Sequence, residues 1–235
     1  MSLSKLKTFS LFISLLSLSL TAFAIEEGFY GGGTRYLSVL KKNNYVQAHF
    51  IDLADKYWET FSGYENSDGT VEIISYNNDN NARWKISATD GGVQAVRGDC
   101  LGDCEDGNSE LYFDLLYPDT GGISGIYQSL AFQRYIIHQV GKKLIGIDLY
   151  KGFDRGDYGF ELTTWKMVSE STYELSKAVY STFGDSPFDA VIMATFSGAV
   201  NERGRVTLQD CVITDTSQPL TCEDFEEILV FERVF

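Results

Sequence analysis

The chain has 235 residues, of which 44% are hydrophobic and 14% aromatic, so it is long enough and apolar enough to bury a full core. Its 19 basic and 33 acidic residues give a formal net charge of −14. A field of this sign repels phosphate backbones and anionic lipid headgroups. Nucleic acid is therefore excluded as a partner, and so is peripheral binding to a membrane surface.

Residues 1–24 have the three-part layout of a secretory signal peptide. Two lysines precede an apolar run that is too short to span a bilayer, and small residues follow at Ala22 and Ala24. We expect cleavage after Ala24. The remaining chain, 25–235, carries a formal charge of −16, because the leader contains two lysines and no acid. The protein is therefore predicted to be exported, to the periplasm or outside the cell.

The rest of the chain has no Pro-rich or Ser-rich linker and no clear repeat, so residues 25–235 are predicted to form a single β-rich domain. Residues 82–88 and 110–117 alternate apolar and polar side chains, as half-buried strands do. Further strands are expected in runs rich in β-branched and aromatic residues, at 71–76, 143–151, 158–168, 188–199, 204–213 and 227–235. The short turns between these runs favour an antiparallel sheet forming a barrel or a sandwich.

One segment has a helical period instead. Its apolar residues fall on one helical face, and Gly63 follows as a stop signal; they are Val46, Phe50, Leu53, Ala54, Tyr57 and Phe61. This spacing predicts an amphipathic helix over 45–60, packed on the sheet. Residues 171–183 fit both a helix and a strand, and the hairpin-like sequence before them favours the strand.

The cysteine content agrees with export, because an even number of cysteines in an exported chain is typical of disulfides. The four are Cys100, Cys104, Cys211 and Cys222. Close spacing favours the pairs Cys100–Cys104 and Cys211–Cys222, although two other pairings stay open. Each short loop would contribute about 2–3 kcal/mol to stability. The cysteine spacing and the low histidine content argue against zinc and against thiol catalysis.

The segment 99–110 is the most acidic part of the chain. Its five carboxylates are Asp99, Asp103, Glu105, Asp106 and Glu110. Carboxylate oxygens suit a hard cation, so calcium is the metal that this composition favours and the one cofactor to consider. The segment does not follow the EF-hand pattern, since Leu101 stands at the third position and Cys104 where a glycine is needed. A solvated acidic loop is the other interpretation.

Catalytic motifs are scarce. The only histidines are His49 and His138, and no serine stands in a G-x-S-x-G elbow. His49 lies in the predicted helix and His138 in an apolar run, where a packed histidine is the commoner outcome. A Ser-His triad is therefore not predicted, and no catalytic residue is assigned. Paired carboxylates leave a secreted hydrolase open as an alternative function.

The aromatic residues give the main functional indication. Trp58, Trp84 and Trp165 are the candidate ligand-binding residues, because indole rings form stacking platforms for sugars and line apolar cavities. Packing in a β-rich core is the alternative role for each. We therefore predict an exported, soluble, non-catalytic protein that binds a small apolar or carbohydrate ligand.

A second alternative comes from the ends of the chain. The C-terminal segment 228–235 ends in phenylalanine and in this resembles the last strand of bacterial outer-membrane barrels, while residues 28–31 resemble their first strand. The resemblance implies an outer-membrane β-barrel. Glu227 and Arg233 depart from the pattern, because a charge facing lipid costs about 2–4 kcal/mol near the bilayer midplane.

Overall fold

The computed structural model describes residues 24–55, 57–75, 83–98, 110–129, 134–151, 158–169, 172–181, 188–197, 203–213 and 229–235. Within these ranges the chain forms 16 β-strands and no helix. None of the described residues belongs to a helix long and apolar enough to cross a membrane. The predicted leader, apart from Ala24, lies outside the described residues.

The first eight strands form a closed antiparallel barrel, in which each strand pairs with the next and β8 pairs with β1. The strands are β1 (Gly28–Gly32), β2 (Arg35–Lys42), β3 (Tyr45–Asp52), β4 (Tyr57–Glu65), β5 (Val71–Ser75), β6 (Arg83–Thr89), β7 (Gly92–Arg97) and β8 (Glu110–Pro118). The prediction of a mainly β, antiparallel fold is therefore confirmed. Of the two predicted architectures, a barrel or a sandwich, the structure shows a barrel.

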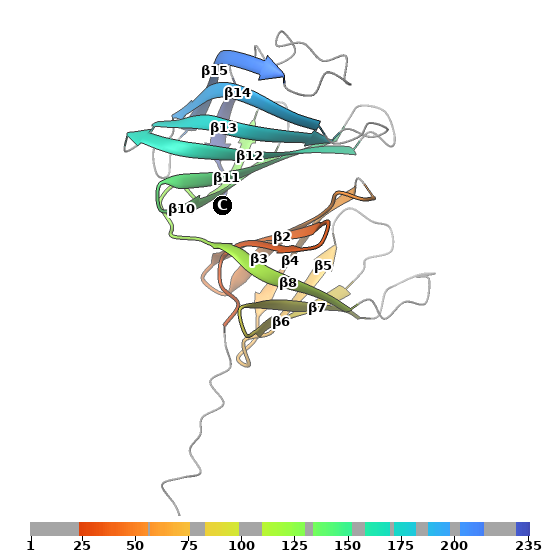
Figure 1. Cartoon of the computed structure of the whole chain (residues 1–235). Helices are drawn as coiled ribbons and strands as arrows, with labels where there is room; N and C mark the ends of the chain where they lie inside the picture. The colour runs from red at the N-terminus through yellow and green to blue at the C-terminus, as the bar shows by residue number, and fades with distance from the viewer. Residues whose placement is uncertain are drawn as a thin grey trace, which may run out of the picture.

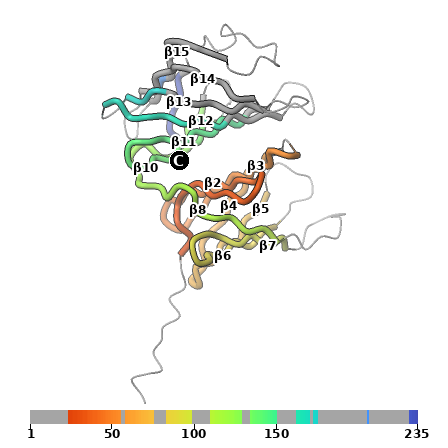
Figure 2. The backbone as a smooth tube through the Cα atoms, viewed as in Figure 1, coloured from red at the N-terminus to blue at the C-terminus, as the bar shows by residue number. Residues whose placement is uncertain are grey.

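The second eight strands form another closed antiparallel barrel, in which β9 lies between β10 and β16. The strands are β9 (Gly125–Ser129), β10 (Arg134–Val140), β11 (Lys143–Lys151), β12 (Tyr158–Ser169), β13 (Thr172–Ser181), β14 (Phe188–Ser197), β15 (Arg203–Ile213) and β16 (Leu229–Arg233). The chain passes from the first barrel to the second once, between β8 and β9, as the tube view shows (Figure 2).

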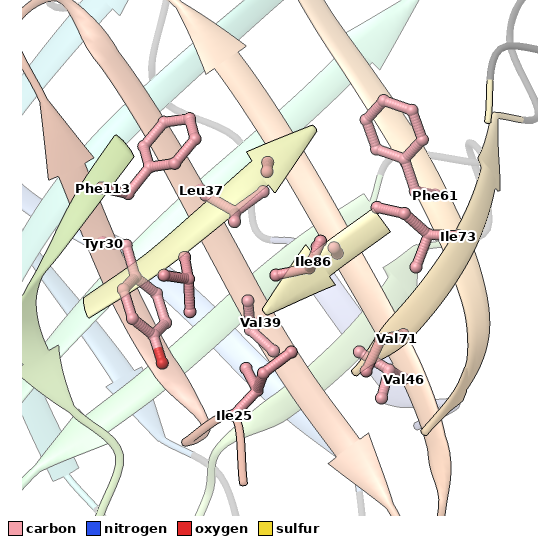
Figure 3. Close-up of a cluster of buried hydrophobic side chains, with 13 residues drawn as sticks. Ile25, Tyr30, Leu37, Val39, Val46, Phe61, Val71, Ile73, Ile86 and Phe113 are labelled. Carbon is pink, nitrogen blue, oxygen red and sulfur yellow. The ribbon is translucent and has the colours of Figure 1, made fainter. Parts of the chain in front are cut away.

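Apolar side chains line the interior of the first barrel because alternate residues of each strand point inward. Figure 3 shows them pointing toward one another from several strands; the buried members are Ile25, Tyr30, Leu37, Val39, Val46, Ala48, Phe61, Val71, Ile73, Ile86, Val93, Ala95 and Phe113. The intervening residues of β6 point outward, and Arg83 and Lys85 are exposed. The predicted alternation over 82–88 thus separates the barrel core from solvent.

The two barrels lie one above the other (Figure 1) and share a second apolar cluster. Outward-facing residues of the first barrel meet outward-facing residues of the second; the buried members are Phe29, Leu40, Ile51, Trp58, Ile126, Ile136, Ile145, Ile147 and Leu149. Burying a large apolar side chain contributes about 1.5–3 kcal/mol. This cluster, called the interface cluster below, therefore fixes one barrel against the other.

The predicted helix over 45–60 is wrong, because strands β3 and β4 occupy this segment. Val46 and Ala48 point into the first barrel, whereas Ile51 points outward into the interface cluster. Since β3 is buried on both faces, its sequence does not show the simple alternation of a half-buried strand. The apolar residues of its two faces happen to combine into a helical period.

The other predicted strands agree with the structure. The runs at 71–76, 143–151, 158–168, 188–199, 204–213 and 227–235 overlap β5, β11, β12, β14, β15 and β16, and the ambiguous segment 171–183 contains β13. Strands β2, β7, β9 and β10 are not among the predicted ones. Asp90 and Gly91 form a two-residue turn between β6 and β7, in which Gly91 has a φ of 83° that favours glycine.

Candidate functional site

The three tryptophans proposed as ligand-binding residues lie in three different places. Trp58 is buried in the interface cluster. Trp165 is buried in the second barrel, where its Nε1 donates to Tyr135 Oη at 3.0 Å and to Thr163 Oγ1 at 2.8 Å. Trp84 lines a pocket inside the first barrel. The structure therefore does not bring the three indole rings together into one site.

The pocket that Trp84 lines has a volume of about 220 Å³. It is surrounded mainly by apolar and aromatic side chains of the first barrel; the lining residues are Leu37, Phe50, Glu59, Phe61, Ile73, Trp84, Ile86, Ala95, Arg97, Leu111 and Phe113. An eight-stranded barrel has an interior just wide enough to be filled by side chains or to hold one small ligand. This space, called the barrel pocket below, is the candidate binding site.

Strand polarity places the barrel pocket at one end of the first barrel. Arg97 is the last residue of β7 and Trp84 lies at the start of β6, where the two are register partners. Ile86 and Ala95 are the next inward-facing residues and therefore lie deeper. The pocket thus has an apolar floor and a rim at the strand ends.

Two charged side chains lie among the described lining residues, Glu59 and Arg97. Glu59 is buried, with 6% of its surface exposed, and its Oε1 accepts a hydrogen bond from Ser75 Oγ. Arg97 is half-buried. The pocket therefore combines an apolar interior with a few polar groups that can orient a ligand, as small-molecule sites do.

Polar residues also form a buried chain of hydrogen bonds between the barrels. Ser38 Oγ, on β2, forms a hydrogen bond with His138 Nε2 at 2.7 Å, and His138 Nδ1 donates to Asp119 Oδ2 at 3.0 Å. Asp119 Oδ1 accepts from the Gly121 backbone N–H and from Ser124 Oγ, both at 2.6 Å. Because the Asp119 carboxylate can only accept, the Nδ1 atom of His138 carries the proton of that bond. We call Ser38, His138 and Asp119 the interface relay.

The interface relay has the order of a serine-hydrolase triad, but its surroundings are those of a structural contact. Ser38 and His138 each have 0% of their surface exposed. A pocket of about 350 Å³ lies beside Asp119, and its lining residues include neither Ser38 nor His138. A nucleophile must reach its substrate. The relay therefore acts by satisfying polar groups that hold the two barrels together.

His49 lies in the same interface as His138 but differs from it in the hydrogen bonding of its ring nitrogens. It is the register partner of both Ser38 and Thr60 and has 0% of its surface exposed. Neither of its ring nitrogens has a hydrogen-bond partner among the described residues. Burial lowers the pKa of His49 to about 3, and the nearby charge of Arg134 adds to this effect. His49 is therefore neutral at physiological pH.

Asp148, in the second barrel, is a buried acid whose ionisation is also affected by burial. It lies on β11, opposite Tyr135 of β10, and has 6% of its surface exposed. Burial raises its pKa to about 7, because the carboxylate loses the solvation it has in water. The structure thus holds a base and an acid whose ionisation is opposed by burial at two separate positions.

The proposed calcium residues fall mostly outside the described part. Asp99, Asp103, Glu105 and Asp106 belong to the connection between β7 and β8 and are not described. Glu110 is exposed at the start of β8, where its Oε1 accepts from Tyr112 Oη at 2.7 Å and from Gln94 Nε2. Among the described residues no group of three or more His, Cys, Asp or Glu side chains is placed to hold a metal ion.

The predicted disulfides also fall outside the described residues. They require Cys100, Cys104 and Cys222, which are not described, and Cys211, of which the backbone is described within β15. The pairing therefore stays a prediction.

Comparison with known proteins adds no further indication of function. No protein family, no curated protein sequence and no solved structure matches this chain significantly.

Proposed function

We propose that this protein binds a small apolar ligand in the barrel pocket and performs no catalysis there. The observation that supports the proposal is a space of about 220 Å³ inside the first barrel, surrounded by apolar and aromatic side chains. Drug-sized ligands occupy pockets of about 300–1,000 Å³. The ligand that fits the barrel pocket is correspondingly small.

The lining favours an apolar ligand over a carbohydrate. Nine of the eleven lining residues are apolar or aromatic, and the other two are Glu59 and Arg97. A sugar carries many hydroxyl groups, and each would lose its hydrogen bonds to water against such a surface. Trp84 is the one predicted ligand-binding residue that keeps this role in the proposal.

The same lining argues against the hydrolase alternative at this site. Glycoside hydrolysis by the usual mechanisms needs two carboxyl groups on either side of the scissile bond. Glu59 is the single carboxylate among the described lining residues. A binding site without acid–base chemistry is therefore the better-supported interpretation.

The outer surface of the first barrel carries charged residues, and this supports the part of the proposal that the protein is exported in soluble form. Its interior is apolar, whereas Arg83, Lys85, Glu110 and Asp114 are exposed on the outside of β6 and β8. A barrel inserted in lipid has the opposite arrangement, with an apolar band on the outside. The proposal therefore includes an exported, soluble protein and not an outer-membrane barrel.

A pocket-filling variant tests the proposal. In Ala95→Phe the added ring points into the barrel pocket, and we expect 1-octanol to bind at least about tenfold more weakly because the ring occupies the space of the ligand. In the control Ser87→Phe the same ring is added on the opposite face of the sheet from Ile86, where binding should not change.

Isothermal titration calorimetry of both variants and of the unmodified protein gives the comparison, and circular dichroism checks that each is folded. Equal affinity in Ala95→Phe and the unmodified protein would place the ligand elsewhere. No saturable binding of 1-octanol to the unmodified protein would also contradict the proposal.

A further inference from the structure

The two charged residues of the barrel pocket are not equivalent. The carboxylate of Glu59 is buried and accepts a hydrogen bond from Ser75. The guanidinium of Arg97 forms no hydrogen bond and no ion pair with the residues that the structure describes. Within the described part of the chain, the donors of the Arg97 guanidinium are therefore open to a ligand.

Arg97 and the apolar lining residues lie at different depths in the barrel pocket. Arg97 ends β7 and lies at the rim, whereas Ile86, Ile73 and Ala95 form the apolar interior below it. The Trp84 side chain lies at the rim on the neighbouring strand, in edge contact with Phe61 at 6.5 Å between ring centroids. A molecule that enters tail first would thus bury its apolar part against the interior and leave its polar end beside Arg97.

A guanidinium binds a carboxylate better than it binds a neutral group. Its planar donors match the two carboxylate oxygens, and the charge-assisted bonds are about twice as strong as neutral ones. A partly desolvated site strengthens the interaction further, because less water competes for the donors.

We propose that the barrel pocket is specific for a small amphiphile with a carboxylate headgroup, which Arg97 binds at the rim while the aliphatic tail occupies the interior. This inference rests on the proposed function, since it names the class of ligand for the same pocket.

The test compares three probes that share an eight-carbon tail: octanoate, 1-octanol and octylammonium. Calorimetry at pH 7 should give an affinity for octanoate at least about tenfold higher than for 1-octanol, because only octanoate forms charge-assisted bonds. Arg97→Met should remove this preference, so that octanoate and 1-octanol bind the variant with about equal affinity. Arg97→Lys should restore part of it, since lysine keeps the charge without the planar donors.

A matched control separates a local contact from a change in overall charge. Arg83→Met removes one cation from the exposed outer face of β6, near Trp84 in sequence, and should leave the octanoate preference intact. Equal loss in Arg83→Met and Arg97→Met would overturn the inference.

The three probes also distinguish this inference from the proposed function. If octanoate and 1-octanol bind equally and Arg97→Met changes neither, the carboxylate specificity is wrong although the pocket binds apolar molecules. A preference for octylammonium would likewise overturn it and assign the headgroup to Glu59. If none of the three probes binds, the proposed function itself fails.

Discussion

Replacing His138 with leucine is expected to lower the free energy of unfolding by about 2–4 kcal/mol, because each buried polar group that loses its hydrogen-bond partner costs about 1–3 kcal/mol. His138 contacts Ser38 through Nε2 and Asp119 through Nδ1, and the variant leaves both partners buried without it. The loss is large because a buried polar group that lacks a partner cannot recover its hydrogen bonds to water. Urea unfolding, followed by tryptophan fluorescence, measures it.

His49→Leu is the matched control, because His49 is buried to the same extent in the same interface. Its ring nitrogens have no hydrogen-bond partner among the described residues, so leucine removes no such bond. We expect a change of less than about 1 kcal/mol, or a gain in stability. If both leucine variants lose the same free energy, burial alone would explain the cost and the interface relay would not hold the barrels together.

The pH dependence of stability is the second prediction with a large expected effect, because His49 and Asp148 act in opposite directions. The pKa of His49 is about 3 in the folded protein and 6.5 as a free side chain, so the unfolded state binds the extra proton between these values. The contribution of neutral His49 to the free energy of unfolding is complete above pH 6.5 and is lost as the pH falls toward 3. It makes the protein less stable in acid.

Asp148 changes the free energy of unfolding with pH in the opposite direction to His49. Its pKa is about 7 in the folded protein and 3.8 as a free side chain, so the folded state binds the extra proton between these values. This contribution is complete below pH 3.8 and is lost as the pH rises through 7. Between about pH 4 and 6.5 the contributions of His49 and Asp148 therefore offset each other.

Single substitutions should separate the opposed effects of His49 and Asp148 on the free energy of unfolding as the pH changes. Relative to the unmodified protein, His49→Leu should lose stability as the pH rises from 4 to 6.5, and Asp148→Asn should gain it, each by up to about 1.4 kcal/mol per pH unit. Urea unfolding at pH 4, 5 and 6 and constant ionic strength gives these differences, in which the other titrating groups cancel. Profiles that stay parallel to that of the unmodified protein would contradict both assignments.

The sequence was sufficient to predict strands that have one wet face. In β6, exposed Arg83 and Lys85 alternate with inward Trp84 and Ile86, so the period of two is visible. In β3 it is not visible, because Val46 packs inside the barrel and Ile51 packs against the second barrel. The wrong helix at 45–60 and the unpredicted strands β2, β9 and β10 share this cause, since they lie where two barrels meet.

The interface relay was beyond the reach of sequence reasoning for a different reason. Ser38 and His138 are 100 positions apart, and their contact exists only because the two barrels pack together. The one signal was local: a serine or a histidine inside an apolar run must find a partner if it is buried. That signal concerned His138 and said nothing about which residue would be its partner.

One of the residues that line the barrel pocket is among the residues that the composition selects. Aromatic content selects Trp84, which lines the barrel pocket, and equally Trp58 and Trp165, which are packed in the interface cluster and the second barrel. Composition does not distinguish these roles. Arg97 was not selected at all, because an arginine at a strand end is ordinary until the fold places it at the rim of a pocket.

The most direct test of the binding site is a nuclear magnetic resonance experiment on protein labelled at the isoleucine methyl groups. With bound 1-octanol we expect nuclear Overhauser contacts from the aliphatic chain to Ile73 and Ile86, which line the barrel pocket. Ile136 and Ile147, which lie in the interface cluster, should show none. Contacts to Ile136 or Ile147 in place of Ile73 and Ile86 would show that the first barrel is not where this protein holds its ligand.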